Sequence, residues 1–326
     1  IKKFKINYLK IILYNDLMNL FLKKDIRWVC HHLHLDKSKT INPSILDKSL
    51  RHMKEKWILM KEVKNQYTDD DLYLRMNSTI DDLYNQNCRK MRTFIDIDNQ
   101  VGLKPINVAL DLKKEWKKKN VDLQIGTQPL DGLETYENIE LFEKACSLVD
   151  FIGCLPSRDK SPEKHLDIVF TQALKEKKPV EAHLDQCNIP SEKETELFCK
   201  YVEKYQYFGK ARAIHSISLA CHPIDYQTII AKRLQNNGIG VIICPSAAIS
   251  MTQHNEFNAP IHNSLGPVNI LLKNKVDVGI GIDNIEDIFM PFCDGNFEFE
   301  LRLLAEASRI YNPKILLNIA ENSMGF

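Results

Sequence analysis

The chain has 326 residues, of which 44% are hydrophobic and 27% are charged. This composition is typical of a soluble protein that buries a substantial core, and it argues against a disordered chain. The 44 Lys and Arg residues nearly balance the 43 Asp and Glu residues, so the formal net charge is +1. Because no strong field would attract nucleic acid or an anionic membrane, the expected partner is a small molecule. The composition leaves open whether the chain forms a homo-oligomer.

The nine cysteines are scattered, odd in number and contain no C-x-x-C pair. This usage is typical of reduced thiols in the cytosol. No apolar run approaches the roughly 18 residues that a membrane-spanning helix needs, and no signal-peptide cleavage pattern follows the Lys-rich start. The sequence therefore predicts a cytoplasmic protein with no membrane partner.

Residues 1–26 mix Lys and Asn with Ile and Leu, and the chain opens without Met. We interpret this segment as an extension or a partial start. Its short apolar bursts are compatible with an amphipathic helix that caps the next domain, and equally with disorder. Residues 27–326 are then expected to form one domain.

Eight short runs with β-forming composition follow, separated by charged segments long enough for helices. Several runs are almost continuously apolar, as in parallel strands that are buried on both faces. The repeated alternation predicts an α/β fold, a closed (β/α)₈ TIM barrel in preference to an open doubly wound sheet. The expected strands are 28–36, 91–98, 121–129, 149–156, 179–186, 211–218, 240–246 and 276–283.

Helical patterns are clearest at 136–148, 161–177, 191–208 and 225–237. The stretch 43–87 is too long for one crossover helix, so two helices are expected there. Two more helices, at 295–311 and 313–324, are expected to close the barrel.

Polar side chains stand at the carboxyl ends of four expected strands, where barrels of this kind carry their active sites. His32 and His34 end the first strand, and the strand period of two points them to the same side. His183, His215 and Asp283 end three later strands. A set of three histidines and one carboxylate from among these residues suits a single divalent ion, Zn²⁺ or Fe²⁺. The H-x-H pair alone is a weak signal, and the prediction depends on agreement among the four strand ends.

These motifs, taken together, resemble those of the amidohydrolase superfamily, and the nearest branch is that of cytosine deaminase and N-isopropylammelide aminohydrolase. The resemblance runs from about residue 28 to the end of the chain. It rests on His32-Leu33-His34 followed by Leu35-Asp36-Lys37-Ser38, on the strands of His183 and His215, and on Asp283-Asn284 before Phe289-Met290-Pro291-Phe292.

The resemblance implies a hydrolase that cleaves a C–N bond other than a peptide bond in a small heterocyclic or amide substrate. His32, His34, His183 and Asp283 would hold one metal ion. Asp283 would also take the proton of the attacking water, and His215 would orient that water or the substrate. Family members usually carry a small β-sandwich as well, which is expected to be truncated or absent in this chain.

The substrate side of the site departs from the family pattern. Cytosine deaminase has a proton-shuttling glutamate where this chain has Gln186, and an amide cannot exchange protons near neutral pH. Asp185 or His215 would then take the task, or the substrate differs. Leu130 replaces the glutamine expected to read a pyrimidine edge, and Gln128 is the possible substitute.

Two further residues, Asn284 and Phe289, are expected to contact the substrate by the same resemblance, Phe289 by stacking on a flat ring. The strand 149–156 has no lysine that could bridge two metal ions, so one ion is expected. No G-x-G-x-x-G or P-loop motif supports an oxidoreductase or a nucleotide hydrolase. The rival hypothesis is an inactive amidohydrolase-like barrel that keeps metal only as a structural feature.

Overall fold

A computed structural model describes residues 26–250 and 265–326. Nearly all of the expected N-terminal extension, residues 1–25, therefore lies outside the described residues. The eight expected strands are all present and parallel, each shorter than its sequence pattern. They are β1 (Val29–Leu33), β2 (Lys90–Asp96), β3 (Asp122–Gln128), β4 (Ile152–Cys154), β5 (Val180–Leu184), β6 (Ala211–His215), β7 (Gly240–Ile243) and β8 (Val278–Ile280).

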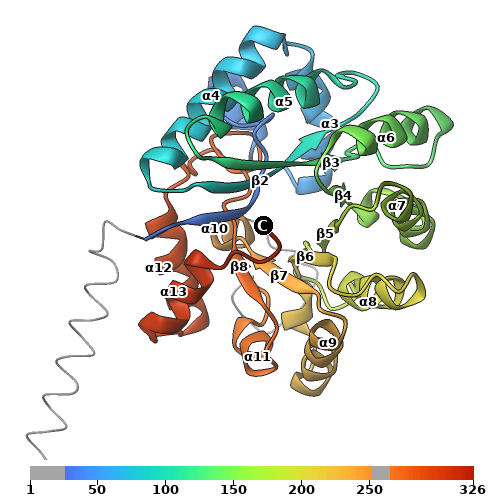
Figure 1. Cartoon of the computed structure of the whole chain (residues 1–326), viewed down its shortest axis with the longest axis vertical. Helices are drawn as coiled ribbons and strands as arrows, with labels where there is room; N and C mark the ends of the chain where they lie inside the picture. Colours follow the sequence, from blue (N-terminus) through green and yellow to red (C-terminus); the bar gives the residue numbers. More distant parts are fainter. Residues whose placement is uncertain (1–25, 251–264) are drawn as a thin grey trace, which may run out of the picture.

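The strands form two arcs, β1-β2-β3 and β4-β5-β6-β7-β8, which two backbone bridges join into a ring. Gly126 pairs with Phe151 at one seam, and Leu33 pairs with Asp283 at the other. Figure 1 shows the strands around a common centre with helices outside them. Solved structures described below have the same architecture, and the predicted (β/α)₈ barrel is confirmed.

Helices fill the connections between strands. The stretch 43–87 contains three helices, where two were predicted, because Asn42 caps one helix start and Thr68 caps another, with a separate helix between them. The helices are α2 (Pro43–Lys48), α3 (Met53–Lys64), α4 (Asp69–Asn85), α5 (Lys104–Lys117), α6 (Tyr136–Leu148), α7 (Pro162–Glu176), α8 (Glu194–Lys204), α9 (Ile224–Asn236), α10 (Pro245–Ser250), α11 (Val268–Lys273), α12 (Phe297–Ser308) and α13 (Pro313–Glu321).

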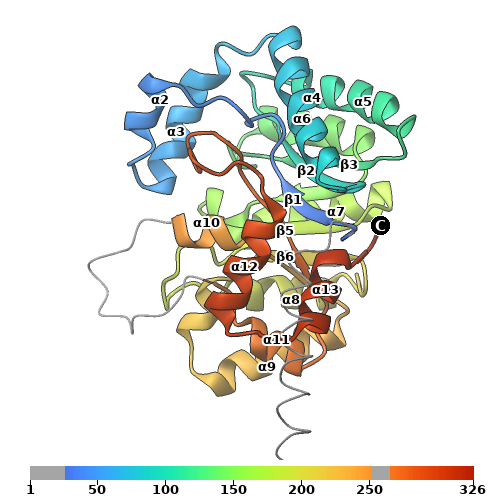
Figure 2. The same ribbon diagram turned by 90° about the vertical axis from the view of Figure 1, so that its left-hand side faces the viewer.

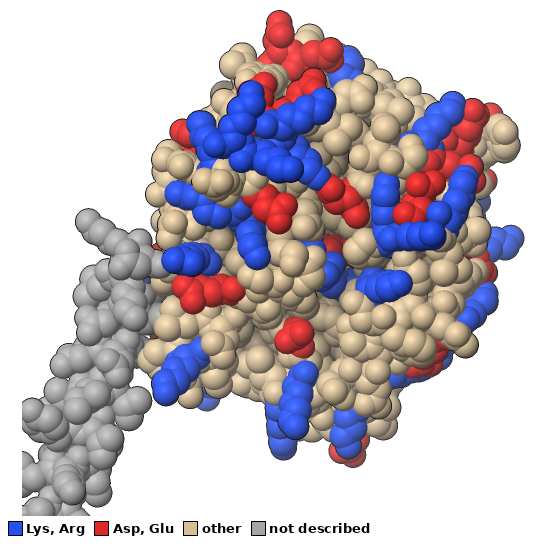
Figure 3. All heavy atoms as spheres, viewed as in Figure 1, with Lys and Arg blue, Asp and Glu red and all other residues tan. Residues whose placement is uncertain are grey.

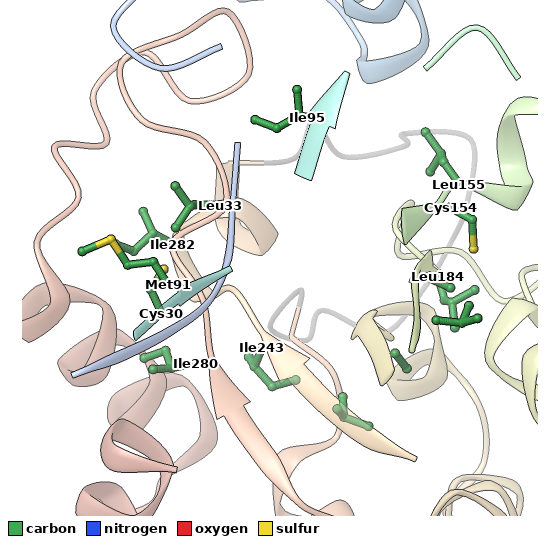
Figure 4. Close-up of a cluster of buried hydrophobic side chains, with 14 of the residues drawn as sticks. Cys30, Leu33, Met91, Ile95, Cys154, Leu155, Leu184, Ile243, Ile280 and Ile282 are labelled. Atoms are coloured by element: carbon green, nitrogen blue, oxygen red, sulfur yellow. The ribbon is translucent and has the colours of Figure 1, made fainter. Parts of the chain in front are cut away.

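Strand alternation divides the core into an outer shell and a barrel interior. The outward residues are aliphatic or sulfur-containing and pack under the helices. Figure 4 shows part of this shell, with side chains from six strands and from the segments that follow β4 and β8: Cys30, Leu33, Met91, Ile95, Cys154, Leu155, Leu184, Ile243, Ile280 and Ile282. Burial of these side chains, at roughly 25 cal/mol per Å² of apolar surface, is the main force that holds the helices on the barrel.

The middle of the barrel interior is apolar. Phe94, Phe151, Ile214 and Ile242 form a separate buried cluster there. The Phe94 and Phe151 rings meet edge to face at 5.0 Å between centroids. Gly153 provides the room, since a Cβ atom at this position would lie 2.5 Å from the Phe94 ring.

Below this apolar layer, at the amino ends of the strands, lies an ionic cluster that we call the lower cluster: Arg92, Glu181 and Arg212. Glu181 Oε1 lies 3.3 Å from Arg92 Nη1 and 2.5 Å from Arg212 Nη1. The last residues of the chain cover this end, where Arg92 Nη1 also donates to the Met324 carbonyl at 3.0 Å. Figure 1 places the C-terminus over the centre of the ring.

Strand alternation predicts that His31, next to the inward His32, faces outward, and the structure shows that this prediction is wrong. The register of β1 against β2 shifts between Cys30 and Leu33. His31 is instead fully buried beside the lower cluster, with its Nε2 2.7 Å from the Asn322 carbonyl oxygen. Burial and the nearby Arg92 lower the pKa of His31 to about 3, so it is neutral at pH 7.

All nine cysteines are free thiols, as the sequence predicts. In residues 26–250 and 265–326, no helix combines the length and apolar composition needed to cross a bilayer. Figure 3 shows Lys and Arg side chains gathered where α4 and α5 lie in Figure 1, with acidic side chains among them.

Candidate active site

The site-bearing residues stand where the chain leaves its strands. Asp185, His215 and Asp283 follow or end β5, β6 and β8, and all three have positive φ angles, of 54°, 71° and 74°. Such backbone conformations are uncommon for residues other than glycine and often mark functional sites. They also explain why the observed strands end earlier than predicted.

Four histidines and one aspartate meet above the apolar layer, and we call them the upper cluster: His32, His34, His183, His215 and Asp283. Asp283 Oδ1 lies 3.0 Å from His32 Nε2 and 3.2 Å from His34 Nε2. His32 Nε2 and His183 Nε2 are 3.2 Å apart. His215 is farther out, with its Nε2 3.8 Å from Asp283 Oδ2. The structure thus brings together all five residues that the strand ends predicted.

The donor atoms of this cluster fit a single metal ion. Ligand atoms about 2.1 Å from a tetrahedral zinc ion lie about 3.4 Å from one another, close to the separations between Asp283 and its neighbours. His183 Nδ1 is 3.3 Å from the Cys154 carbonyl, to which it donates, so its Nε2 carries a lone pair. His32 Nε2 lies 3.2 Å from this nitrogen, a spacing that suits two ligands of one ion.

The protonation states agree with this assignment. Burial lowers the pKa of His32, His34 and His183, so their rings are neutral at pH 7 and available as ligands. Burial by itself raises the pKa of Asp283, but His32 and His34 hold it well below its usual range. Burial lowers the pKa of His215 to about 4.

A cavity of about 380 Å³ opens directly above these ligands. His34, His183, His215 and Asp283 form part of its lining. Apolar and aromatic side chains complete much of the wall: Met53, Trp57, Leu130, Leu155, Ile189, Ile217, Ala247, Phe289 and Met290. A space of this size, largely apolar with a few polar groups, is typical of a small-molecule site.

Four of the predicted substrate-side residues line this cavity: Gln128, Gln186, Asn284 and Phe289. Gln128 Oε1 and Gln186 Nε2 are buried and have no hydrogen-bond partner in the described part of the chain. Buried polar atoms are rarely left unpaired, so these two amides are available to a ligand. Asn284 donates from Nδ2 to Asp287 Oδ2 at 2.5 Å, which holds it in place.

Asp185, predicted as one possible proton shuttle, does not line the cavity. Its carboxylate turns to the start of α8, where Oδ1 accepts from Glu194 N at 2.7 Å and Oδ2 accepts from Thr195 N at 3.2 Å. The positive φ of Asp185 directs the side chain to these backbone donors. The structure therefore gives Asp185 a helix-capping position.

Sequence reasoning assigned no role to several polar residues of the cavity. Lys37 stands in the quoted Leu-Asp-Lys motif, and its Nζ lies 2.6 Å from Asp96 Oδ1. Lys64 Nζ lies 2.8 Å from Asp96 Oδ2. These two ammonium groups occupy the surroundings of Asp36 and Asp96, carboxylates that otherwise form a possible ligand group with His34. This second group therefore resembles a buried salt-bridge network more than a second metal site.

Glu192 and Lys56 also line the cavity. Glu192 lies in the loop between β5 and α8 and accepts hydrogen bonds from Cys187 N at 2.9 Å and from Ser218 Oγ at 2.5 Å. Lys56 comes from α3. Nothing in the sequence marked either residue, because loops and crossover helices have no strand-end pattern.

No family model matches the chain. An uncharacterized protein of Haemophilus influenzae is 29% identical over 252 residues, which cover 75% of this chain and 90% of that protein. An N-isopropylammelide isopropyl amidohydrolase of Pseudomonas sp. is 22% identical over 209 residues, 63% of this chain. The match spans 48% of that longer protein.

Several solved structures have the same fold as this chain. The 5-methylcytosine deaminase of Klebsiella pneumoniae with bound 5-fluorocytosine superposes with a TM-score of 0.83 at 21% identity, covering 90% of this chain and 72% of that one. N-isopropylammelide isopropylaminohydrolase of Burkholderia multivorans has a TM-score of 0.73 at 18% identity, again over 90% of this chain and 72% of that one.

A more distant structure, an atrazine chlorohydrolase of Arthrobacter aurescens in complex with zinc, has a TM-score of 0.61 at 12% identity, covering 90% of this chain and 68% of that one. The chain is thus similar to proteins of the cytosine deaminase and N-isopropylammelide branch, and the predicted fold is confirmed.

Proposed function

We propose that this protein is a metal-dependent amidohydrolase or deaminase that hydrolyses a C–N bond, other than a peptide bond, in a small heterocyclic or amide substrate. The observation that carries the proposal is the meeting of His32, His34, His183 and Asp283, three of which (His34, His183 and Asp283) line a cavity. The similar proteins of known activity, which act on methylcytosine and N-isopropylammelide, support the same reaction class.

His32, His34, His183 and Asp283 would hold one divalent ion, Zn²⁺ or Fe²⁺. Bound there, the ion would supply a nucleophilic water near neutral pH, since metal ions lower the pKa of water from 15.7 to roughly 7. β4 and the residues that flank it, 149–156, contain no lysine that could bridge two metal ions. This absence favours a single metal ion.

Proton transfer would depend on Asp283 and His215. Oδ1 of Asp283 faces the histidine ligands, whereas Oδ2 faces His215. Oδ2 would receive the proton lost by the attacking water. Neutral His215 Nε2, 3.8 Å away, would then share or relay it to the leaving nitrogen. Gln186 cannot perform this step, because an amide does not exchange protons at neutral pH.

The free amides would orient the substrate. Gln186 Nε2 would donate to a carbonyl or ring nitrogen, and Gln128 Oε1 would accept from an N–H group. Phe289 and Asn284 complete the same wall. Because Leu130 and Gln186 both depart from the cytosine deaminase pattern, cytosine is a poor candidate, and another heterocycle or an acyclic amide is favoured.

The alternative of an inactive barrel with a structural metal receives no support from this arrangement. A structural site is usually closed by protein ligands, whereas the ligands here open onto a cavity with free hydrogen-bonding groups. We also propose a cytoplasmic location, because nine free thiols suit a reducing compartment.

The test combines elemental analysis with a substrate screen. Purified protein should contain about one metal ion per chain. The His32→Ala/His34→Ala double variant should lose it, and His222→Gln, a histidine packed on Tyr226 in α9, should keep it.

Metal-loaded protein is then assayed for release of ammonia or amine from substituted cytosines, N-alkylated aminotriazines and simple cyclic and acyclic amides. Failure to bind metal after reconstitution, or metal binding without turnover of any substrate in this panel, would contradict the proposed activity.

A further inference from the structure

Lys56 places a buried positive charge on the wall of the cavity. It belongs to α3, its residue is 7% exposed, and it lines the same cavity as the upper cluster. Figure 2 shows α3 beside the loop that leads from β8 to α12. The contact between them is made by Lys56 Nζ, which lies 3.4 Å from the Phe289 carbonyl oxygen.

Lys56 differs from the other buried lysines in its lack of an acidic partner. Lys37 and Lys64 both lie within 3 Å of Asp96 carboxylate oxygens, at 2.6 and 2.8 Å. In the described ranges, no carboxylate oxygen lies within 4.0 Å of Lys56 Nζ, and the long contact to Phe289 is its hydrogen bond. A buried charge without a counter-ion is costly, so a partner other than the described residues would stabilise Lys56.

Asp287 is the acidic residue whose attraction Lys56 feels, but its oxygens already have partners. Oδ1 accepts from Phe289 N at 2.8 Å and from Met290 N at 3.0 Å, and Oδ2 accepts from Asn284. Burial raises the pKa of Asp287 to about 7, which reduces its negative charge. Burial lowers the pKa of Lys56, as expected for an ammonium group that lacks a close partner.

The other charged side chains of the cavity also place positive charge near Lys56. Arg51 precedes α3, and Lys54 lies in its first turn. Both side chains are exposed and line the cavity close to Lys56 in the sequence. The acidic lining residues are Asp283, which belongs to the metal ligands, and Glu192, which holds the loop after β5. One wall of the cavity is therefore cationic, and it is separate from the predicted metal ligands.

We propose that Lys56 binds an anionic group of the substrate, so that the substrate is a heterocycle or amide that carries a carboxylate or an ionised ring oxygen. This inference rests on the proposed function and narrows its substrate class. The anion takes the place of the missing counter-ion, while the scissile C–N bond lies toward His183 and Asp283. Arg51 and Lys54 attract the anion to the mouth of the cavity.

Binding of three flat pyrimidines tests the inference without requiring turnover. Orotate carries a carboxylate, barbiturate carries an ionised ring oxygen, and uracil is neutral near pH 7. Calorimetric titration of the zinc-loaded protein should show at least one anion bound about tenfold or more tightly than uracil. A preference for orotate alone assigns a carboxylate, and a preference for barbiturate alone assigns a ring oxygen.

Lys56→Met should remove this preference, and Lys56→Arg should keep it. Lys61→Met is the matched control on the same helix, because Lys61 pairs with Asp131 at 3.1 Å and is not among the cavity residues. Circular dichroism checks that each variant is folded. Equal binding of anions and uracil would overturn the inference, as would an anion preference that survives in Lys56→Met, since the metal would then be the anion's partner.

The titrations are repeated on metal-free protein to separate this inference from the proposed function. An absence of metal binding would defeat the proposed function, whereas a Lys56-dependent preference for anions would still be measurable.

Discussion

Two polar clusters lie inside the barrel, one at each end of the strands. In the lower cluster, the single carboxylate of Glu181 meets the guanidinium groups of Arg92 and Arg212. In the upper cluster, Asp283 meets histidines that burial keeps neutral, and the Nε2 atoms of His32 and His34 both approach its Oδ1. An apolar layer that includes Phe94 and Phe151 separates the two.

The difference between the clusters lies in what completes them. The lower cluster pairs opposite charges within the chain, and the C-terminal residues cover it. The upper cluster offers electron pairs and one negative charge to a cation that the chain does not supply. We therefore expect changes in the lower cluster to affect folding and changes in the upper cluster to affect metal binding and catalysis.

The largest expected effect comes from the upper cluster. His183→Ala removes one predicted ligand and should lower kcat/KM by about a thousandfold or more, since the attacking water depends on the ion. The bound metal should fall well below one per chain. In urea unfolding, the metal-free variant should differ less from metal-free wild type than any lower-cluster variant does. Full activity, or a loss of stability without a loss of metal, would reverse the assignment of this cluster.

Glu181→Gln should produce the opposite pattern. The amide has the same shape but no charge, so it leaves Arg92 and Arg212 buried together without a counter-ion. Breaking a buried ion pair in this way typically costs about 3 to 5 kcal/mol of folding free energy. Urea unfolding measures this cost, and elemental analysis should still find the metal. An unchanged free energy of unfolding would show that the lower cluster does not stabilise the fold.

Glu300 is a smaller test of the same idea, because its carboxylate is buried without the two guanidinium partners of Glu181. It lies on α12, and its Oε2 accepts from Ser246 N at 3.0 Å. Burial raises its pKa to about 7 from an ordinary value near 4.5. The folded state therefore holds this proton more tightly than the unfolded state. The stability contribution of Glu300 should be fully present below pH 4.5 and fall by about 3 kcal/mol as the pH rises to 7.

Glu300→Gln should remove that pH-dependent loss. Its free energy of unfolding, compared with that of wild type, should improve steadily between pH 4.5 and 7 and then level off. Unfolding curves measured at several pH values give this difference directly. A constant difference across the range would contradict the raised pKa.

Much of the barrel could be predicted from the sequence because its signals are local. Several strands buried on both faces are nearly continuous apolar runs, and the alternation of short β-forming runs with helical segments located all eight. The ligands could be located because parallel strands bring their carboxyl ends to one edge. His32, His34, His183, His215 and Asp283 meet for that reason, although they are spread over most of the chain.

The features that escaped prediction depend on backbone detail or on packing between distant segments. A register shift in β1 turns His31 inward, and a positive φ turns Asp185 toward α8. Neither leaves a mark in residue type. Lys56 reaches the cavity because α3 packs against the loop of Phe289, a contact between residues 233 positions apart.

The seam between β1 and β8 gives the predicted metal a mechanical consequence. His34 N donates to the Asp283 carbonyl at 3.1 Å and Asp283 N donates to the His32 carbonyl at 3.0 Å, so the first and last strands meet through the residues that would bind the ion. Coordination by His32 and Asp283 would cross-link positions 251 residues apart. In a chain-entropy description, a cross-link that closes so long a loop lowers the conformational entropy of the unfolded chain, which stabilises the fold by on the order of 5 kcal/mol. The ion would then hold β1 and β8 together, and its removal should destabilise the junction between these two strands before the rest of the barrel.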